Sequence, residues 1–116
     1  MAKVTITPVE LSINTAASRD REDMTTDHAE MTVAKPRKVV LLVENEDTAD
    51  ACSIVVKAGD FINAGVGDLT TSIALSSSKL IGPFESARFS DSDGKIQIET
   101  SSTGTLDGKI EAILLP

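Results

Sequence analysis

Residues 93–99, which read DGKIQIE, and residues 107–114, which read DGKIEAIL, decide the fold of this chain. In both stretches apolar residues alternate with charged or polar ones, a period of two that is typical of strands with one buried face. Each stretch opens with Asp-Gly, which indicates a tight turn, because glycine accepts the positive φ that such a turn demands. We therefore predict two strands here, as neighbours in one sheet. The alternating apolar residues are Ile96, Ile98, Ile110, Ala112 and Leu114.

Apolar segments recur upstream at intervals of roughly 8 to 14 residues, a spacing that favours a sandwich or jelly roll over a βαβ fold. Residues 37–46 (RKVVLLVENE) form an unbroken β-branched and leucine run, which is typical of a strand buried on both faces. Gly82-Pro83 interrupts the last segment and indicates a bulge, a bend or a crossing between sheets, since proline cannot donate to a strand ladder. The other segments are 51–57 (ACSIVVK), 69–75 (LTTSIAL) and 79–89 (KLIGPFESARF).

The N-terminal part of the chain divides into an apolar and a polar stretch. Residues 4–13 can supply a first strand, with Pro8 placing it at a sheet edge or breaking it in two. Residues 14–35 (NTAASRDREDMTTDHAEMTVAK) are charge-mixed and poor in large apolar side chains. We predict a long polar surface loop or arm over 14–35. The alternative is a short helix over 18–31, with acidic residues near its start.

These segments together predict one all-β domain spanning residues 1–116, an antiparallel β-sandwich or a jelly-roll or barrel-like fold of about 7–8 strands. The composition is 41% hydrophobic but only 3% aromatic, so the core must consist of Val, Ile, Leu and Ala around a few phenylalanines. We expect Phe84 and Phe89 to belong mainly to that core. Cys52 is the only cysteine, which excludes an intrachain disulfide, and we expect it to be a small buried side chain.

The composition also limits the partners. A formal net charge of −7 repels phosphate backbones and anionic lipid surfaces, so we expect neither nucleic acid nor membrane as a partner. The aromatic scarcity argues against the stacking platforms of carbohydrate-binding and single-strand-binding modules. The N-terminus has no apolar signal region, and no stretch approaches the roughly 18 apolar residues of a membrane span. We expect the protein to stay in the cytosol unless it leaves as part of something larger.

The residues carry no recognisable catalytic or metal-binding motif. His28 is the only histidine, and no serine lies in the strand-turn-helix elbow of a nucleophilic hydrolase, so we predict no catalytic residue and no enzyme. Residues 90–95 (SDSDGK) contain a D-x-D-G fragment, but a calcium loop would need glutamate where Thr100 stands, so a turn is the better interpretation. The glycine-rich connection 59–68 matches neither phosphate-binding glycine motif. We expect no metal, no cofactor and no small-molecule substrate.

Two places are candidates for contact with a partner protein. Phe61 and Ile62 are bulky apolar residues inside the Gly- and Asp-rich connection, where they either fold back over the core or protrude toward a partner. Arg19, Arg21 and Met24 lie in the arm over 14–35 and form the second candidate.

Five segments of the chain form a familiar series: 54–60 (IVVKAGD), 65–69 (GVGDL), 81–89 (IGPFESARF), 93–96 (DGKI) and 114–116 (LLP). In this series the chain resembles small proteins encoded among the head genes of tailed bacteriophages and prophages. These are capsid decoration (cement) proteins or closely allied virion structural proteins. The likeness covers residues 37–116 and the N-terminal strand, and it consists of turn and strand signatures rather than catalytic ones.

The resemblance implies a non-enzymatic β-sandwich subunit that binds the outer surface of a head shell, often as a trimer, and stabilises it. Such a protein would be made in the host bacterial cytoplasm and located on the virion, with the major capsid protein or other virion subunits as partners. Each contact can be weak, because several tethered copies bind together. The alternative is a free-standing β-sandwich binding module of the adhesin or carbohydrate-recognition type, which the lack of aromatic platforms disfavours.

Overall fold

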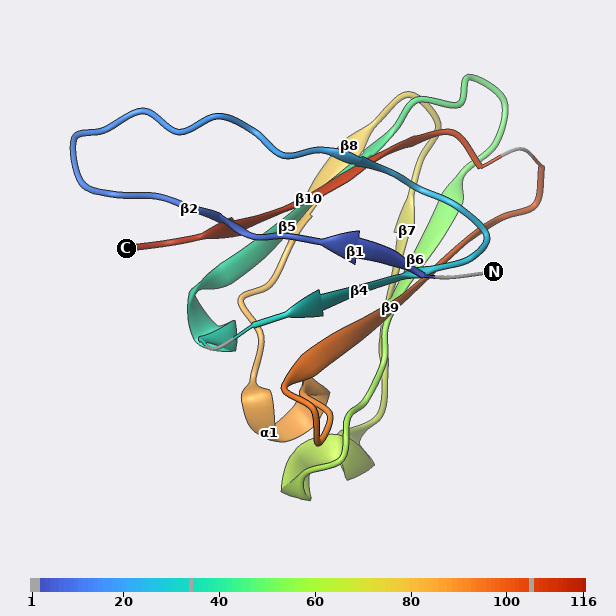
Figure 1. Cartoon of the computed structure of the whole chain (residues 1–116). Helices are drawn as coiled ribbons and strands as arrows, with labels where there is room; N and C mark the ends of the chain where they lie inside the picture. Colours follow the sequence, from blue (N-terminus) through green and yellow to red (C-terminus); the bar gives the residue numbers. More distant parts are fainter. Residues whose placement is uncertain (1–2, 34, 105) are drawn as a thin grey trace.

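The computed structural model, which describes residues 3–33, 35–104 and 106–116, is a sandwich of two β-sheets (Figure 1). Sheet A has the order β1-β4-β9-β6-β7, and sheet B has the order β2-β10-β5-β8, with β3 also paired to β10. The strands of sheet A are β1 (Val4–Ile6), β4 (Ala29–Thr32), β9 (Lys95–Ser102), β6 (Cys52–Val56) and β7 (Leu69–Ile73). Those of sheet B are β2 (Val9–Glu10), β10 (Gly108–Leu114), β5 (Val39–Asn45), β8 (Ser78–Ile81) and β3 (Glu22–Asp23).

The predicted all-β sandwich is confirmed, although its ten described strands exceed the predicted number. The N-terminal stretch breaks in two around Pro8, so that β1 pairs in parallel with β4 in sheet A and β2 pairs in parallel with β10 in sheet B. The other described strand pairs are antiparallel. The N-terminal stretch therefore supplies an edge strand to each sheet, and both sheets are mixed rather than wholly antiparallel.

Three short helical turns connect the strands: η1 (Pro36–Lys38) and η2 (Ile62–Val66) are 3-10 helices, and α1 (Ser86–Phe89) is a single α-helical turn. The apolar segment 79–89, predicted as a strand, is therefore only partly one. Its strand β8 ends at Ile81, directly before Gly82-Pro83, where the sequence indicated an interruption.

The prediction that the strands of 93–99 and 107–114 are neighbours was wrong. They become β9 and β10, which lie in different sheets. Strand β9 is flanked by β4 and β6, and β10 is flanked by β5 on one side and by β2 and β3 on the other. Because both strands find partners distant in sequence on each side, neither has an edge left for the other.

The prediction of a loop or helix over 14–35 was wrong for the second half of that segment. Residues 11–21 form a surface loop, but β4 lies inside sheet A between β1 and β9. Ala29 and Met31 of β4 point into the core with exposed fractions of 2% and 0%. Two small or flexible apolar residues at a spacing of two are enough for a strand when neighbouring strands cover both of its edges.

Strand β5 also differs from its prediction. Its burial alternates strictly, with Val39, Leu41 and Val43 fully buried and Val40 and Leu42 only half-buried. The sequence indicated burial on both faces, whereas this chain covers one. The outer face of sheet B therefore keeps apolar side chains at the surface.

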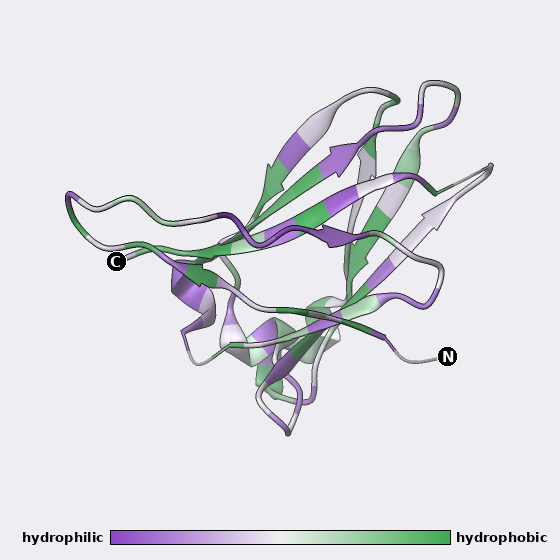
Figure 2. Cartoon of the chain, turned by 45° about the horizontal axis from the view of Figure 1, so that its top comes forward, coloured by the Kyte–Doolittle hydropathy of each residue, from purple (hydrophilic) through white to green (hydrophobic). Residues whose placement is uncertain are grey.

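The core lies between the two sheets, and Figure 2 shows green apolar stretches along the strands that contribute to it. Phe84 and Phe89 are buried there as predicted, with ring centroids 5.6 Å apart in an edge-to-face arrangement. Cys52 is a buried free thiol, and burial raises the pKa of that thiol. The largest fully buried side chains include Phe84, Ile6, Met31, Leu41, Ile54, Ile73, Ile96, Ile98 and Ile110.

Candidate interaction surfaces

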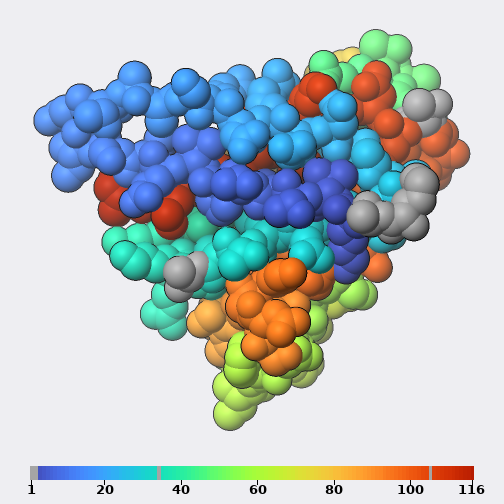
Figure 3. Space-filling model, viewed as in Figure 1, coloured from blue at the N-terminus to red at the C-terminus, as the bar shows by residue number. Residues whose placement is uncertain are grey.

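The segment of η2 forms the narrow end of the molecule (Figure 3), and three exposed apolar side chains lie on and beside it. We call Phe61, Ile62 and Val66 the apolar tip; their exposed fractions are 50%, 91% and 67%. No residue of η2 is buried. Of the two alternatives that the sequence left for Phe61 and Ile62, the structure therefore has the protruding one.

The apolar tip is held by hydrogen bonds between the strands and turns on either side of it. Asp68 Oδ1 accepts a 2.6 Å hydrogen bond from the backbone N–H of Ala58, and Asp68 Oδ2 accepts one of 2.8 Å from Lys57 Nζ. The Ala58 N–H and the Lys57 ammonium lower the pKa of the Asp68 carboxyl. Arg88 Nε donates to the carbonyl oxygen of Gly67 at 3.0 Å, which ties the end of η2 to α1.

A close backbone approach fixes the start of the tip. The Gly59 N–H donates to the carbonyl oxygen of Arg88 at 2.8 Å, and the Asp60 N–H donates to that of Ser90 at 3.1 Å. A Cβ atom at position 59 would lie 1.9 Å from the Ser90 carbonyl oxygen, so only glycine fits there. Phe61 thus follows two residues whose backbone is bonded to a different part of the chain. The tip is a built projection rather than a free loop.

The tip is also acidic around its apolar centre. The segments that form and support the tip carry several exposed or partly exposed carboxylates. Among these are the side chains of Asp60, Glu85, Asp91 and Asp93. Arg88, by contrast, is occupied within the chain, since its guanidinium lies 4.6 Å from the centre of the Phe89 ring and donates to the η2 end. A partner that fits this surface would offer an apolar socket with a basic rim.

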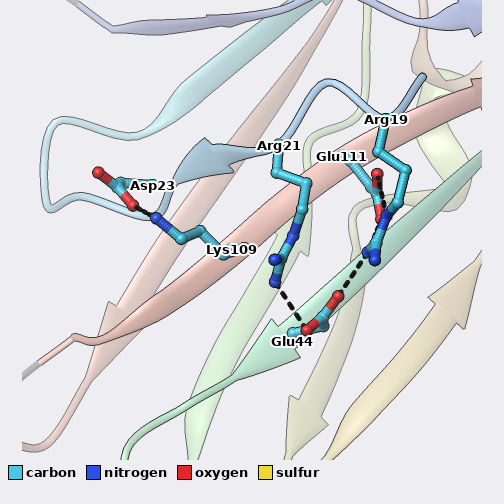
Figure 4. A network of polar contacts seen from close by, with 6 residues as sticks. All are labelled: Arg19, Arg21, Asp23, Glu44, Lys109 and Glu111. Carbon is cyan, nitrogen blue, oxygen red and sulfur yellow. Dashed lines mark hydrogen bonds and ion pairs between the residues drawn. The ribbon is translucent and has the colours of Figure 1, made fainter.

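The second predicted contact site is already occupied by the chain itself. Arg19 and Arg21 both reach Glu44 of β5, at 2.7 and 2.8 Å, and Arg19 also forms a two-pronged contact with Glu111 of β10 (Figure 4). Glu111 is only 3% exposed, and its hydrogen bonds raise the pKa of the Arg19 guanidinium. The ion-pair cluster, as we call it, consists of Arg19, Arg21, Asp23, Glu44, Lys109 and Glu111.

Met24, predicted with Arg19 and Arg21 as a contact residue, lies in the core with an exposed fraction of 5%. Its neighbour is Gly108, where an added Cβ would meet the Met24 terminal carbon at 2.6 Å. Met24 therefore anchors the far end of the loop rather than offering itself to a partner. The structure brings Phe61 and Ile62 together as a surface and separates them from the three arm residues.

Val66 and the outer face of sheet B were not among the contact surfaces predicted from the sequence. The signal for Val66 was its position in the same Gly-rich connection as Phe61. The signal for the outer face was the unbroken apolar run of residues 37–46.

The single histidine and the D-x-D-G fragment have local structural roles. His28 Nδ1 accepts a 3.1 Å hydrogen bond from the backbone N–H of Thr100. Asp91 Oδ1 accepts from the backbone N–H groups of Asp93 and Lys95, both at 2.9 Å, which is the turn that the sequence predicted. Among the described residues, no three His, Cys, Asp or Glu side chains are placed to hold a metal ion.

The helices of the described part of the chain are all too short to cross a membrane. Three of the five segments on which the sequence resemblance depends meet at the tip. Residues 54–60 enter it, 65–69 leave it, and 81–89 carry the α1 turn that packs beside η2. No protein-family model matches this chain, and neither the curated proteins nor the solved structures contain a significant match to it.

Proposed function

We propose that this protein is a virion structural protein that binds the outer surface of a phage head shell and stabilises it without catalysis. The observation that carries the proposal is the apolar tip, whose Ile62 is 91% exposed. Exposed large apolar residues are common singly, but a group on a fixed projection marks a contact with another protein.

The tip suits a weak contact that is repeated many times. Burying one isoleucine side chain contributes on the order of 2 kcal/mol, which is too little to hold a single copy in place. Several copies on one particle bind together far more tightly than one, because each bound copy raises the local concentration of the next contact. The resemblance to head-gene proteins supports a shell as the particle, and a trimer is the assembly that it implies.

The proposed docking partner is an apolar socket with lysine or arginine around it, on the major capsid protein or another shell subunit. The acidic residues beside the tip, Asp60 and Glu85 among them, favour approach to a basic rim. The same charges disfavour the packaged genome as a partner.

The test is sedimentation of the purified protein with purified heads of the phage or prophage that carries its gene. Ile62→Ser removes the most exposed apolar side chain of the tip, and we expect it to weaken head binding about tenfold or more while the fold is unchanged. Leu75→Ser is the matched control, because Leu75 is also exposed, at 46%, but lies in the turn after β7, at the end of that strand away from the tip. It should bind heads like the unmodified protein.

Equal binding of the Ile62→Ser variant and the unmodified protein would exclude the tip as the contact. Failure of the unmodified protein to sediment with heads would contradict the head-binding role itself. In that case specific binding on a glycan array would support the alternative, a free-standing binding module.

A further inference from the structure

The outer face of sheet B has two halves of opposite character. Outward positions pair across the strands, Ile113 with Val40 and Leu42 with Leu80, so that their side chains are neighbours. Leu115 continues the parity of Ile113, and its backbone N–H donates to the carbonyl oxygen of Lys38 at 2.7 Å. We call Val40, Leu42, Leu80, Ile113 and Leu115 the apolar half-face.

Figure 2 looks toward this sheet, and the apolar ends of β5 and β8 lie at the same end of it, with their polar residues at the other. Leu80 is 68% exposed and Leu115 is 40% exposed, while Val40, Leu42 and Ile113 are half-buried. The sequence of residues 39–43 is therefore typical of a strand with both faces buried, but this chain buries only the inner face. A second protein surface is needed to cover the outer one.

The other half of the face carries charges that cancel. Its ion-pair cluster contains three carboxylates and three cationic side chains, all paired with one another. The chain as a whole has a formal charge of −7, so this is a locally neutral face on a strongly acidic molecule. Two copies that approach through this face avoid the repulsion that other approaches incur.

The edge of sheet B beside this face is protected against strand addition. Lys79 lies on the edge strand β8. Its ammonium donates a 2.9 Å hydrogen bond to the carbonyl oxygen of Ser72 on β7, an edge strand of sheet A. An edge that carries a lysine in this way is disfavoured for pairing with another chain. The apolar half-face can then be covered by packing against it rather than by extension of the sheet.

We infer that the apolar half-face is the surface through which copies of this chain pack against one another around a symmetry axis. The occupant is a second copy because the face is apolar at one end and neutral at the other. A partner of opposite charge would gain nothing at this face, whereas a second copy offers apolar side chains to it without charge repulsion. The inference does not rest on the proposed head-binding role, which uses the tip instead.

The test is light scattering of the unmodified protein and of Leu80→Lys across a concentration series extending to the highest soluble concentration. We expect the unmodified protein to associate and Leu80→Lys to raise the dissociation constant about tenfold or more. Because Leu80 is largely exposed, circular dichroism and thermal unfolding at low concentration should show an intact fold. Ile62→Lys is the matched control, since it places the same charge on an even more exposed apolar position at the tip.

The expected pattern is that Leu80→Lys loses self-association and keeps single-copy head binding. Ile62→Lys should keep self-association and lose head binding. A monomer at every concentration would overturn the inference. So would an oligomer that Leu80→Lys leaves intact, or one that both lysine variants weaken equally, because net charge would then explain the effect. None of these outcomes depends on whether heads are bound.

Discussion

At the scale of the residue, one glycine shows how tightly the tip is built. The missing side chain at Gly59 lets the backbone that precedes Phe61 lie against the carbonyl oxygen of Ser90. We expect Gly59→Ala to lower the free energy of unfolding by about 1–3 kcal/mol, since the added Cβ must push backbone aside. Urea unfolding monitored by circular dichroism measures this change.

Gly65 in η2 provides the control for that substitution. A Cβ at Gly65 meets no atom within 4 Å, so Gly65→Ala should change the free energy of unfolding by less than about 1 kcal/mol. If the two alanine variants are equally stable, the close approach at Gly59 does not constrain the fold, and the tip is looser than its hydrogen bonds indicate.

At the scale of the element, the connection from β6 through η2 to β7 is closed by Asp68. The pKa of this carboxyl is lowered, first by the Ala58 N–H and then by Lys57. Its hydrogen bonds therefore stabilise the folded state fully above the ordinary aspartate pKa of 3.8, and this stabilisation is lost as the pH falls through the lower folded-state value.

This linkage predicts a pH-dependent difference between the unmodified protein and Asp68→Asn. The variant should be less stable at neutral pH, and the stabilities of the two proteins should converge in acid. Protonation of Asp68 in the unmodified protein removes the same negative charge that the substitution removes. Unfolding free energies measured from about pH 2 to about pH 7 test this. Asp93→Asn, in the exposed turn nearby, is the control; a difference for Asp68→Asn that does not vary with pH would contradict the assignment.

At the scale of the whole molecule, the acidic charge and the neutral face act in opposite directions on assembly. Long-range repulsion between copies is screened when the Debye length falls from about 30 Å at 0.01 M salt to about 8 Å at 0.15 M. If copies meet at the apolar half-face, added sodium chloride should strengthen self-association. Light scattering at these two salt concentrations measures the effect, and weaker association at the higher concentration would mean that opposite charges, not apolar packing, hold the copies together.

The alternation of Ile96 with Ile98 and of Ile110 with Ala112 was sufficient to predict strands and a sandwich, since the side-chain period of a strand is a local property. The burial of Phe84 and Phe89 also followed from the sequence, because few other large side chains were available for the core. Phe61 and Ile62 were identified as candidates by composition alone, as bulky apolar residues among Gly and Asp.

Tertiary structure alone decided which strands are partners, because strand pairing depends on long-range contacts that no local pattern records. It placed β9 and β10 in different sheets and turned residues 29–32 into an inner strand. It also decided that Phe61 and Ile62 protrude and that Arg19 and Arg21 are paired within the chain. Exposure and ion pairing are properties of surfaces assembled from distant segments. The sequence by itself therefore determined the fold class and most of the strands, and the packing of the strands determined the surfaces.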